Sequence, residues 1–251
     1  MIVEIKTQEQ YQYPILPTGC EVTATSILLN SLMNNHGDRC KLNIDKISKE
    51  SLANKIIKEQ DPDPITKLVG NPYRAFIGSP YSKDSFGVFH QPIYNLIKQI
   101  LNEDIGNENI EVIDLTTNEN KLFKYSLILN ESKEYIQSRL DYFENDSNNY
   151  NDEDFEILKN HMIKYNLPII IWMTLELKKP NLTDEWIDVN NQSQPLYWVS
   201  PEHCATLSGF DEIENKVIIT DPHTGKIERY CKTLFLKRWR QLGRQAVSIK
   251  F

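Results

Sequence analysis

The sequence predicts an α+β protein in which a helical N-terminal portion packs on an antiparallel β-sheet formed by the C-terminal portion. Before about residue 166, apolar residues recur three and four positions apart, as they do on one face of a helix. After residue 166, short β-branched segments follow one another with turn residues between them. We expect one domain over residues 1–251, with a helical part at about 12–165 and a β part at about 166–251.

The first predicted helix begins near Thr18 and ends at the Asn-Asn-His-Gly segment of residues 34–37. Its broad apolar stripe, which includes Ile27, Leu28 and Leu32, predicts that this helix is buried at the centre of the fold. The remaining helices are expected at about 43–58, with Asn43 as a candidate cap, at 91–102, and at 131–165 with a polar interruption at 145–154.

Extended structure is predicted at the N-terminus, in one long loop and in the C-terminal third of the chain. Residues 1–16 suit an extended segment, part of which lies against a groove. Residues 65–89 combine Pro, Gly and aromatic side chains without periodicity, as in an ordered loop that borders a cleft. Strands are predicted at 110–115, 168–174, 203–210, 216–221, 226–230 and 246–251.

Composition and charge argue against several classes of function. The 28 basic and 35 acidic side chains give a formal net charge of -7, which disfavours nucleic acid as a partner because phosphate binding needs basic residues. Apolar runs such as Leu167–Met173 are far shorter than the roughly 20 residues that span a bilayer. Residues 1–6 lack the apolar core of a signal peptide, so we expect a cytoplasmic protein or one secreted with its signal removed.

No metal or cofactor site is predicted. The acidic runs Asp61–Pro64 and Asp152–Asp154 lack the spacing of a calcium-binding loop, and no glycine-rich phosphate-binding motif occurs. The four cysteines lie far apart without a Cys-x-x-Cys pair, which argues against a disulfide framework and a zinc ribbon. At least one thiol is therefore available for chemistry.

Two groups of residues have both a structural and a functional interpretation. The basic run Lys237–Arg240 could contact phosphate or anionic lipid, but a solvated helix face is the favoured prediction in so acidic a chain. Five aromatic side chains could line a cleft, although packing in the core is favoured. They are Tyr81, Trp172, Trp186, Tyr197 and Trp198.

Cys20 is the strongest candidate for chemistry. The segment from Thr18 to Glu21 fits a capping box with Thr18 as N-cap, which places Cys20 in the first helical turn. Unpaired backbone N–H groups and the helix dipole favour a thiolate there, so we expect a lowered thiol pKa. The structural alternative is that Cys20 is a small buried residue at the start of a core helix.

A cysteine nucleophile needs a base, normally a histidine, and a third group that orients the imidazole. Among the five histidines, His203 begins a predicted strand whose hairpin partner ends at Asp221. If the turn is centred near residue 212, residues whose numbers sum to about 424 face each other, and His203 and Asp221 meet this condition. His223 is the main rival base.

Acyl transfer also needs hydrogen-bond donors for the developing oxyanion, and a side-chain amide upstream of the cysteine can join the backbone N–H of the cysteine itself. Gln12 is the candidate for this role, and Gln10 is its competitor. The structural alternative is an ordinary exposed glutamine.

A series of short motifs begins with Gln12 and the Leu-Pro-Thr-Gly-Cys-Glu-Val-Thr segment of residues 16–23. The later motifs are Phe76–Pro80, Gly87–Phe89, Leu167–Trp172, Glu202–Cys204, Leu207–Phe210, Thr220–Pro222, Trp239 and Leu242–Val247. Over about residues 12–247 they resemble, in the same order, the bacterial peptidase C39-like family, which is related to the bacteriocin-leader-processing peptidases and belongs to the papain-like fold.

The resemblance implies a papain-like cysteine peptidase that acts on a peptide or protein substrate through an acyl-enzyme. By this resemblance Cys20 is the nucleophile, His203 the general base and acid, Asp221 the orienting carboxylate and Gln12 the oxyanion donor. The same residues leave open an acyltransferase and a binding module that keeps the fold without turnover. Two segments are longer than the family core needs, at 118–160 and 178–198.

Overall fold

The computed structural model describes residues 1–38, 42–104, 110–116, 132–145 and 152–251. Its helices are α1 (Cys20–His36), η1 (Ile44–Ile47), α2 (Lys49–Lys55), α3 (His90–Asp104), α4 (Lys133–Asn145), α5 (Glu153–Tyr165), η2 (Leu175–Leu177) and α6 (Lys232–Gln241), where η marks a 3₁₀-helix. Its strands are β1 (Ile2–Glu4), β2 (Lys58–Glu59), β3 (Leu68–Val69), β4 (Phe76–Ile77), β5 (Glu111–Asp114), β6 (Ile169–Thr174), β7 (Asn181–Asp188), β8 (Asn191–Ser200), β9 (Glu202–Asp211), β10 (Lys216–Asp221), β11 (Lys226–Cys231) and β12 (Ala246–Lys250).

The main sheet is antiparallel and has seven strands in the described part of the chain. Six of them run in the order β11-β10-β9-β6-β12-β5. Strand β1 pairs with the C-terminal end of β9, beyond the part of β9 that pairs with β6. The predicted strands of the C-terminal part are therefore confirmed. Two strands of this sheet, β1 and β5, come from before residue 166.

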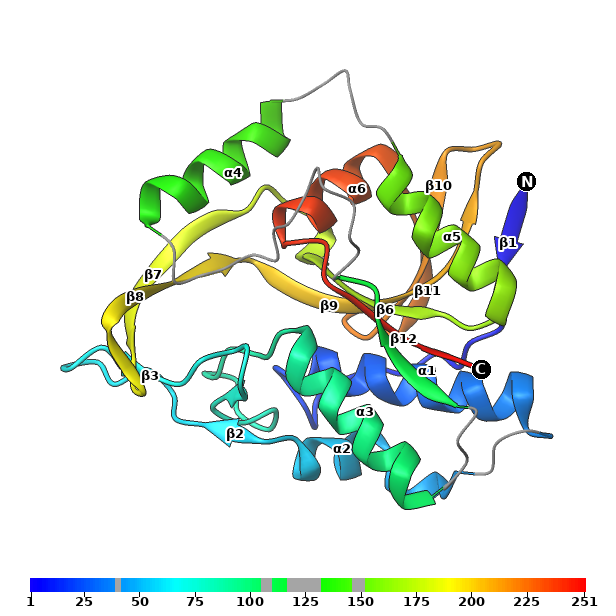
Figure 1. Cartoon of the computed structure of the whole chain (residues 1–251), viewed down its shortest axis with the longest axis horizontal. Helices are drawn as coiled ribbons and strands as arrows, with labels where there is room; N and C mark the ends of the chain where they lie inside the picture. The colour runs from blue at the N-terminus through cyan, green and yellow to red at the C-terminus, as the bar shows by residue number, and fades with distance from the viewer. Residues whose placement is uncertain (39–41, 105–109, 117–131, 146–151) are drawn as a thin grey trace.

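Helices cover both faces of the main sheet, with α1 and α3 on one side and α5 and α6 on the other (Figure 1). Strand β6 is buried along its whole length, and its side chains alternate between the two faces. Trp172 packs with the cluster that includes α1 and α3, whereas Ile171 and Met173 pack with α5 and α6. The sheet is thus the middle layer of the molecule.

The first helix is buried, as predicted. Val22, Ala24 and Leu28 have no exposed surface. Polar side chains in this helix form hydrogen bonds to backbone carbonyls, including Thr25 Oγ1 to Glu21 at 2.7 Å. These hydroxyl groups therefore keep hydrogen-bond partners although the helix is buried.

The helix predicted at 43–58 is instead two short helices, η1 and α2. Asn43 caps η1 as expected, because its side chain accepts a hydrogen bond from the backbone N–H of Asp45 at 2.9 Å. Ser48 then adopts an extended conformation, and its hydroxyl accepts the N–H of Ser51 at 3.2 Å as the cap of α2. A second cap interrupts what the apolar pattern alone predicts as one helix.

The segment predicted as an extension at 178–198 forms the β7–β8 hairpin, which joins β3 in a separate three-stranded sheet. The rings of Trp186 and Trp198 lie 4.5 and 5.5 Å from that of Phe86. Core packing is confirmed for four of the five aromatic residues, while Tyr81 is 41% exposed. Residues 118–131 and 146–151 of the other predicted extension, and Cys40, lie outside the described residues.

The basic run 237–240 does not form a solvated helix face, so that prediction is wrong. Arg238 and Arg240 on α6 are 5% and 2% exposed and form ion pairs with Glu144 and Asp154. Carboxylates from α4 and α5 allow these guanidinium groups to be buried.

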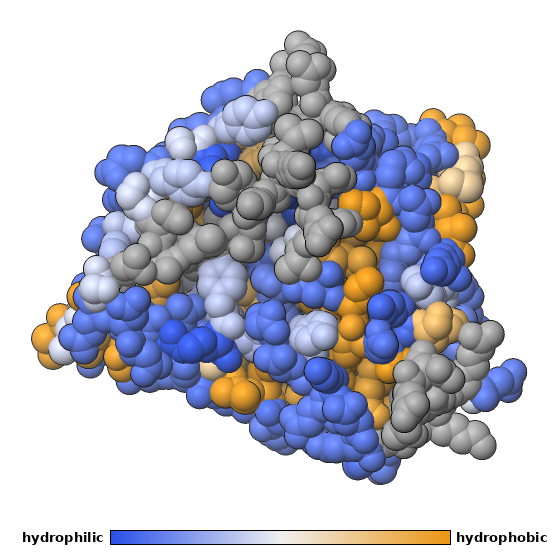
Figure 2. All heavy atoms as spheres, viewed as in Figure 1, coloured by the Kyte–Doolittle hydropathy of each residue, from blue (hydrophilic) through white to orange (hydrophobic). Residues whose placement is uncertain are grey.

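The surface in the view of Figure 2 is mostly hydrophilic and is crossed by a narrow apolar strip. None of the helices in the described ranges is long and apolar enough to span a membrane. Large apolar side chains are buried mainly in the two clusters on either side of the main sheet.

Candidate active site

Helix α1 begins at Cys20, with Gly19 as its N-cap and no side-chain cap. The predicted capping box is therefore wrong. The hydroxyl of Thr18 donates instead to the carbonyls of Ser79 and Ser82, at 3.2 and 2.9 Å. Thr18 thus ties the start of the helix to the 79–82 loop, and Cys20 is the first helical residue rather than the second.

The thiol of Cys20 lies against strand β9. Cys20 is only 6% exposed, its Sγ donates to Oε2 of Glu21 at 3.4 Å, and the backbone N–H of Cys204 lies near enough to the sulfur to lower the pKa of the thiol. Cys204 directly follows His203 in the chain. The packing of α1 on β9 therefore brings the predicted nucleophile to the strand that carries the predicted base.

His203 and Asp221 form a buried hydrogen-bonded pair. His203 Nε2 lies 2.7 Å from Asp221 Oδ1, and the two residues are 3% and 1% exposed. The pairing of the backbones differs from the prediction, because Thr220 lies opposite Thr206 rather than opposite Cys204. The turn is centred closer to residue 213, and a bulge follows Ile218, yet the two side chains still meet.

Asp221 is held by three donors. Besides His203, its Oδ1 accepts the backbone N–H of His223 at 2.8 Å, and its Oδ2 accepts the hydroxyl of Tyr230 at 3.2 Å. Burial raises the pKa of the Asp221 carboxyl, but these hydrogen bonds and the charge of His203 outweigh burial, so the pKa lies below its usual value. The Asp221 carboxylate accepts the hydrogen bond of His203 Nε2, which leaves Nδ1 available for proton transfer.

The rival base, His223, has a different partner. Its Nδ1 lies 3.1 Å from the hydroxyl of Tyr13, and its ring centre lies 6.0 Å from that of His203. His223 contacts Asp221 through its backbone N–H, whereas His203 does so through its imidazole. The geometry therefore favours His203 as the oriented imidazole.

Tyr13 is a residue of this site that the sequence did not single out. Burial raises the pKa of its phenol, and the charges of Cys20, Tyr11 and Asp221 raise the pKa further, so its hydroxyl belongs to the same electrostatic environment as the thiol. Its position directly after Gln12 is the sequence feature that could have indicated a role for Tyr13 in this site.

Gln12 is 3% exposed and is fixed at both its backbone and its side chain. Its backbone N–H donates to Pro222 at 3.0 Å, and its Nε2 donates to Pro17 at 3.0 Å. The second Nε2 hydrogen has no acceptor within the described part of the chain. The competitor Gln10 donates to Ser26 on α1 at 3.1 Å, so Gln12 remains the predicted oxyanion donor.

Glu21 and Glu202 are two further residues beside the thiol that the sequence analysis did not propose. Glu21 has no exposed surface, and its Oε1 accepts the backbone N–H of Val88 at 2.7 Å. One oxygen of each carboxyl and the Cys20 sulfur all lie within 4.8 Å of one another. The sequence could have indicated both residues, because Glu21 directly follows Cys20 and Glu202 directly precedes His203.

The pKa of the Cys20 thiol is raised, so the expected lowering is wrong. Burial raises this pKa well above its usual value, and the nearby Glu21 and Glu202 carboxyls raise it further. The Cys204 N–H opposes the shift only in part. Burial also raises the pKa of Glu21, to about 7, and together with the charge of Glu21 it raises the pKa of Glu202. The position at the head of the helix therefore does not by itself give this thiol a low pKa.

The cluster of Cys20, Glu21 and Glu202 is compact enough to be considered for a metal. Both oxygens of Glu21 already accept hydrogen bonds, from Val88 and from the thiol, and the cluster contains no imidazole. We therefore interpret it as a hydrogen-bonded group beside the predicted nucleophile.

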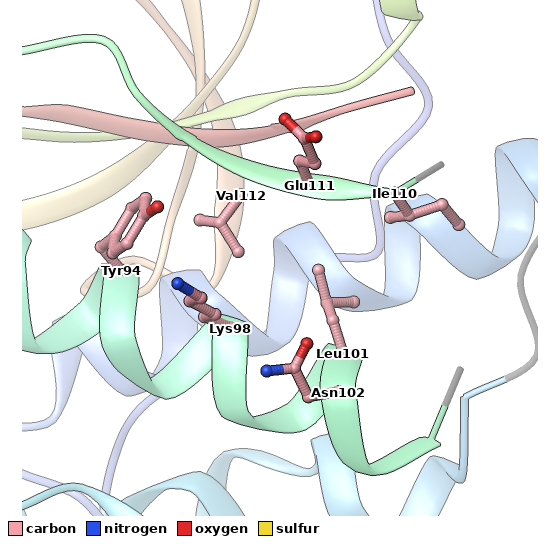
Figure 3. A pocket seen from close by; sticks show the side chains of 7 residues that line it. All are labelled: Tyr94, Lys98, Leu101, Asn102, Ile110, Glu111 and Val112. Carbon is pink, nitrogen blue, oxygen red and sulfur yellow. The ribbon is translucent and has the colours of Figure 1, made fainter. Parts of the chain in front are cut away.

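A separate hollow of about 290 Å³ lies between α3 and β5 (Figure 3). Its lining includes none of the four predicted site residues. The lining consists of Tyr94, Lys98, Leu101, Asn102, Ile110, Glu111 and Val112.

Comparison with known proteins identifies the family. The model of the Peptidase_C39 like family matches residues 2–125 and 114–247. The chain belongs to this family. It is 24% identical over 251 residues to the uncharacterized protein YvpB of Bacillus subtilis strain 168, a match that covers 99% of this chain and 75% of YvpB.

The fold of this Peptidase_C39 like protein also has a counterpart among solved structures. A crystal structure of a Bacillus anthracis protein assigned as a C39-like peptidase matches with a TM-score of 0.64 and 22% identity. The match covers 100% of this chain and 98% of the other. The combination of helices and antiparallel sheet is therefore shared along the whole chain.

Proposed function

We propose that this protein is a cysteine peptidase of the papain-like fold, which hydrolyses a peptide or amide bond through Cys20, His203 and Asp221. The observation that carries the proposal is the buried 2.7 Å hydrogen bond between His203 and Asp221 on the strand pair that packs beside the head of α1. Membership of the Peptidase_C39 like family supports the same chemistry.

Acylation starts with transfer of the Cys20 proton to Nδ1 of His203. In the structure the thiol donates to Glu21, so this hydrogen bond has to break before the S–H can turn toward the imidazole. The thiolate then adds to the substrate carbonyl carbon, and the new oxyanion accepts hydrogen bonds from the Cys20 N–H and from Gln12. As the oxyanion collapses, the C–N bond breaks and the His203 imidazolium protonates the leaving amine.

Deacylation reverses these roles with water as the nucleophile. His203 removes a proton from the water, a C–O bond forms at the thioester carbonyl, and the C–S bond then breaks. The proton on His203 returns to the sulfur, and the acid product leaves. Asp221 stabilises the imidazolium in both halves of the reaction because its carboxylate accepts the Nε2 hydrogen.

Replacement of Cys20 by Ala tests the proposal. Wild-type protein is first screened against a library of fluorogenic peptides, and cleavage is then compared in Cys20→Ala and Cys231→Ala. Cys231 is an exposed free thiol, so its removal should leave cleavage unchanged, whereas Cys20→Ala should abolish it. Full cleavage by folded Cys20→Ala protein would exclude Cys20 as the nucleophile.

A further inference from the structure

A carboxyl pair lies behind the nucleophile and takes no part in the steps above. Glu21 belongs to α1 and Glu202 to β9, and their carboxyl groups meet over Gly87. A Cβ atom on Gly87 would lie 2.4 Å from Oε1 of Glu21 and 3.3 Å from Oε2 of Glu202. Only glycine therefore leaves room for both carboxyl groups at this point.

The hydrogen bonds distinguish the two members of the pair. Glu21 is an acceptor at both oxygens, from the Val88 N–H at 2.7 Å and from the Cys20 thiol at 3.4 Å. Glu202 Oε1, in contrast, is buried and has no hydrogen-bond partner in the described structure. Glu21 has the contacts of a carboxylate, and Glu202 has the surroundings of a neutral acid.

The titratable groups around Glu21 and Glu202 in the described structure are acids, which do not offset negative charge on both carboxyl groups. The titratable groups that face the pair are Cys20 on α1 and Cys204 on β9, and Asp221 on β10 faces Cys204 in turn. All three are acids. No cationic side chain in the described part of the chain compensates the two carboxyl groups, and such a pair favours retention of one proton, as in other carboxyl pairs that share a site.

We propose that Glu21 and Glu202 share one proton and that the remaining charge on Glu21 controls the nucleophilicity of Cys20. A charged Glu21 holds the thiol hydrogen and opposes a second negative charge on sulfur, whereas a neutral Glu21 allows the thiolate to form more readily. Glu21 and Glu202 are thus positioning residues. Their effect on turnover rests on the proposed function, but their effect on the thiol can be measured without a substrate.

The experiment measures the rate of iodoacetamide alkylation of Cys20 between pH 5.5 and 9.5, by peptide mass spectrometry, in wild type, Glu21→Gln and Glu202→Gln. Glutamine keeps the shape of the side chain and an acceptor for the Val88 N–H. The exposed Cys231 in the same samples is the internal reference, and Glu153→Gln at the exposed start of α5 is the matched control.

The proposal predicts an asymmetry between the two glutamine variants. Glu21→Gln removes the charge next to sulfur, so alkylation of Cys20 at pH 7.5 should accelerate at least ten-fold and the apparent thiol pKa should fall by one unit or more. Glu202→Gln mimics the protonated member, so the rate at pH 7.5 should stay within about two-fold of wild type. At the alkaline end of the pH range this variant should be faster than wild type, because the wild-type pair loses its shared proton there and gains a second negative charge beside the sulfur, which the glutamine cannot carry.

Equal alkylation rates of Cys20 in wild type and in folded Glu21→Gln would overturn the proposal. Slowing of alkylation to the same extent in both glutamine variants would also overturn it, because a purely structural role predicts that result. If Glu21→Gln does not fold, Glu202→Gln decides, and a pH profile identical to that of wild type then refutes the shared proton. If the alkylation rates change as predicted but the protein cleaves no peptide, the result supports the shared proton and refutes the proposed function.

Discussion

Replacing Asp221 by Asn removes one charge from the proposed triad and keeps the shape of the side chain. The asparagine carbonyl can still accept hydrogen bonds from His203 and from the N–H of His223, and the amide can donate to the oxygen of Tyr230. The main loss is therefore electrostatic, at a buried site 2.7 Å from the imidazole.

The size of this loss follows from the charge pair. Two unit charges about 4 Å apart interact by about 4 kcal/mol at an effective dielectric constant of about 20. Because ~1.36 kcal/mol corresponds to a ten-fold change in rate, loss of this whole interaction would lower kcat/KM by about 10³. The hydrogen bond kept by the asparagine carbonyl reduces the loss, so we expect a decrease of at least about ten-fold.

The assay measures kcat/KM on a peptide identified from the library, with circular dichroism as the check of folding. Asp45→Asn is the control, because Asp45 is an exposed residue of η1. A decrease below ten-fold in a folded Asp221→Asn protein would refute the argument that this carboxylate stabilises the imidazolium. A loss of equal size in Asp45→Asn would show that the assay reports stability rather than chemistry.

Two more outcomes are expected. Gln12→Ala should lower kcat by about 10²–10³ with a much smaller change in KM, because an oxyanion donor acts in the transition state, and an equal effect of Gln10→Ala would contradict this role. Burial lowers the pKa of His161 to about 4, below the ~6.5 of an unfolded chain, so protonation of the unfolded state should remove up to about 3 kcal/mol of stability as pH falls from about 6.5 to 4. Urea unfolding should show this pH dependence reduced in His161→Gln, and an unchanged dependence would contradict the assignment.

The elements of the main sheet and the central helix are predictable because their signal is local. The apolar stripe of α1 and the uninterrupted run of β6 are properties of adjacent residues, and burial on both faces follows from them. The β7–β8 hairpin was not predictable in this way, since Asn181–Asp188 is largely polar and only alternate residues near its end are buried.

The meeting of His203 and Asp221 could be predicted from the hairpin, although its backbone register could not. The turn is centred about one and a half residues later, which shifts the pairing beside the turn by three residues, and the bulge after Ile218 reduces the shift to two at Thr220. Side chains at the open end of a twisted strand pair can still meet across such a shift. The prediction of the contact was therefore more robust than the pairing rule that led to it.

The reactivity of Cys20 could not be predicted from its own segment. A position at the head of a helix favours the thiolate, but the pKa depends on burial and on Glu202, which is distant in sequence and close in space. The same limit applies to Arg240, whose partner Asp154 lies on another helix. Long-range contacts decide the charge state of a site, and the local sequence does not contain them.

Intact-protein mass spectrometry of the acyl-enzyme is the most direct test of the proposed mechanism. Wild-type protein mixed with an excess of a cleaved peptide and quenched in acid within milliseconds should gain the mass of the acyl portion of that peptide, on Cys20 by peptide mapping. Folded Cys20→Ala protein should gain no such mass and cleave nothing. Turnover without an adduct, together with full activity of Cys20→Ala, would contradict the account.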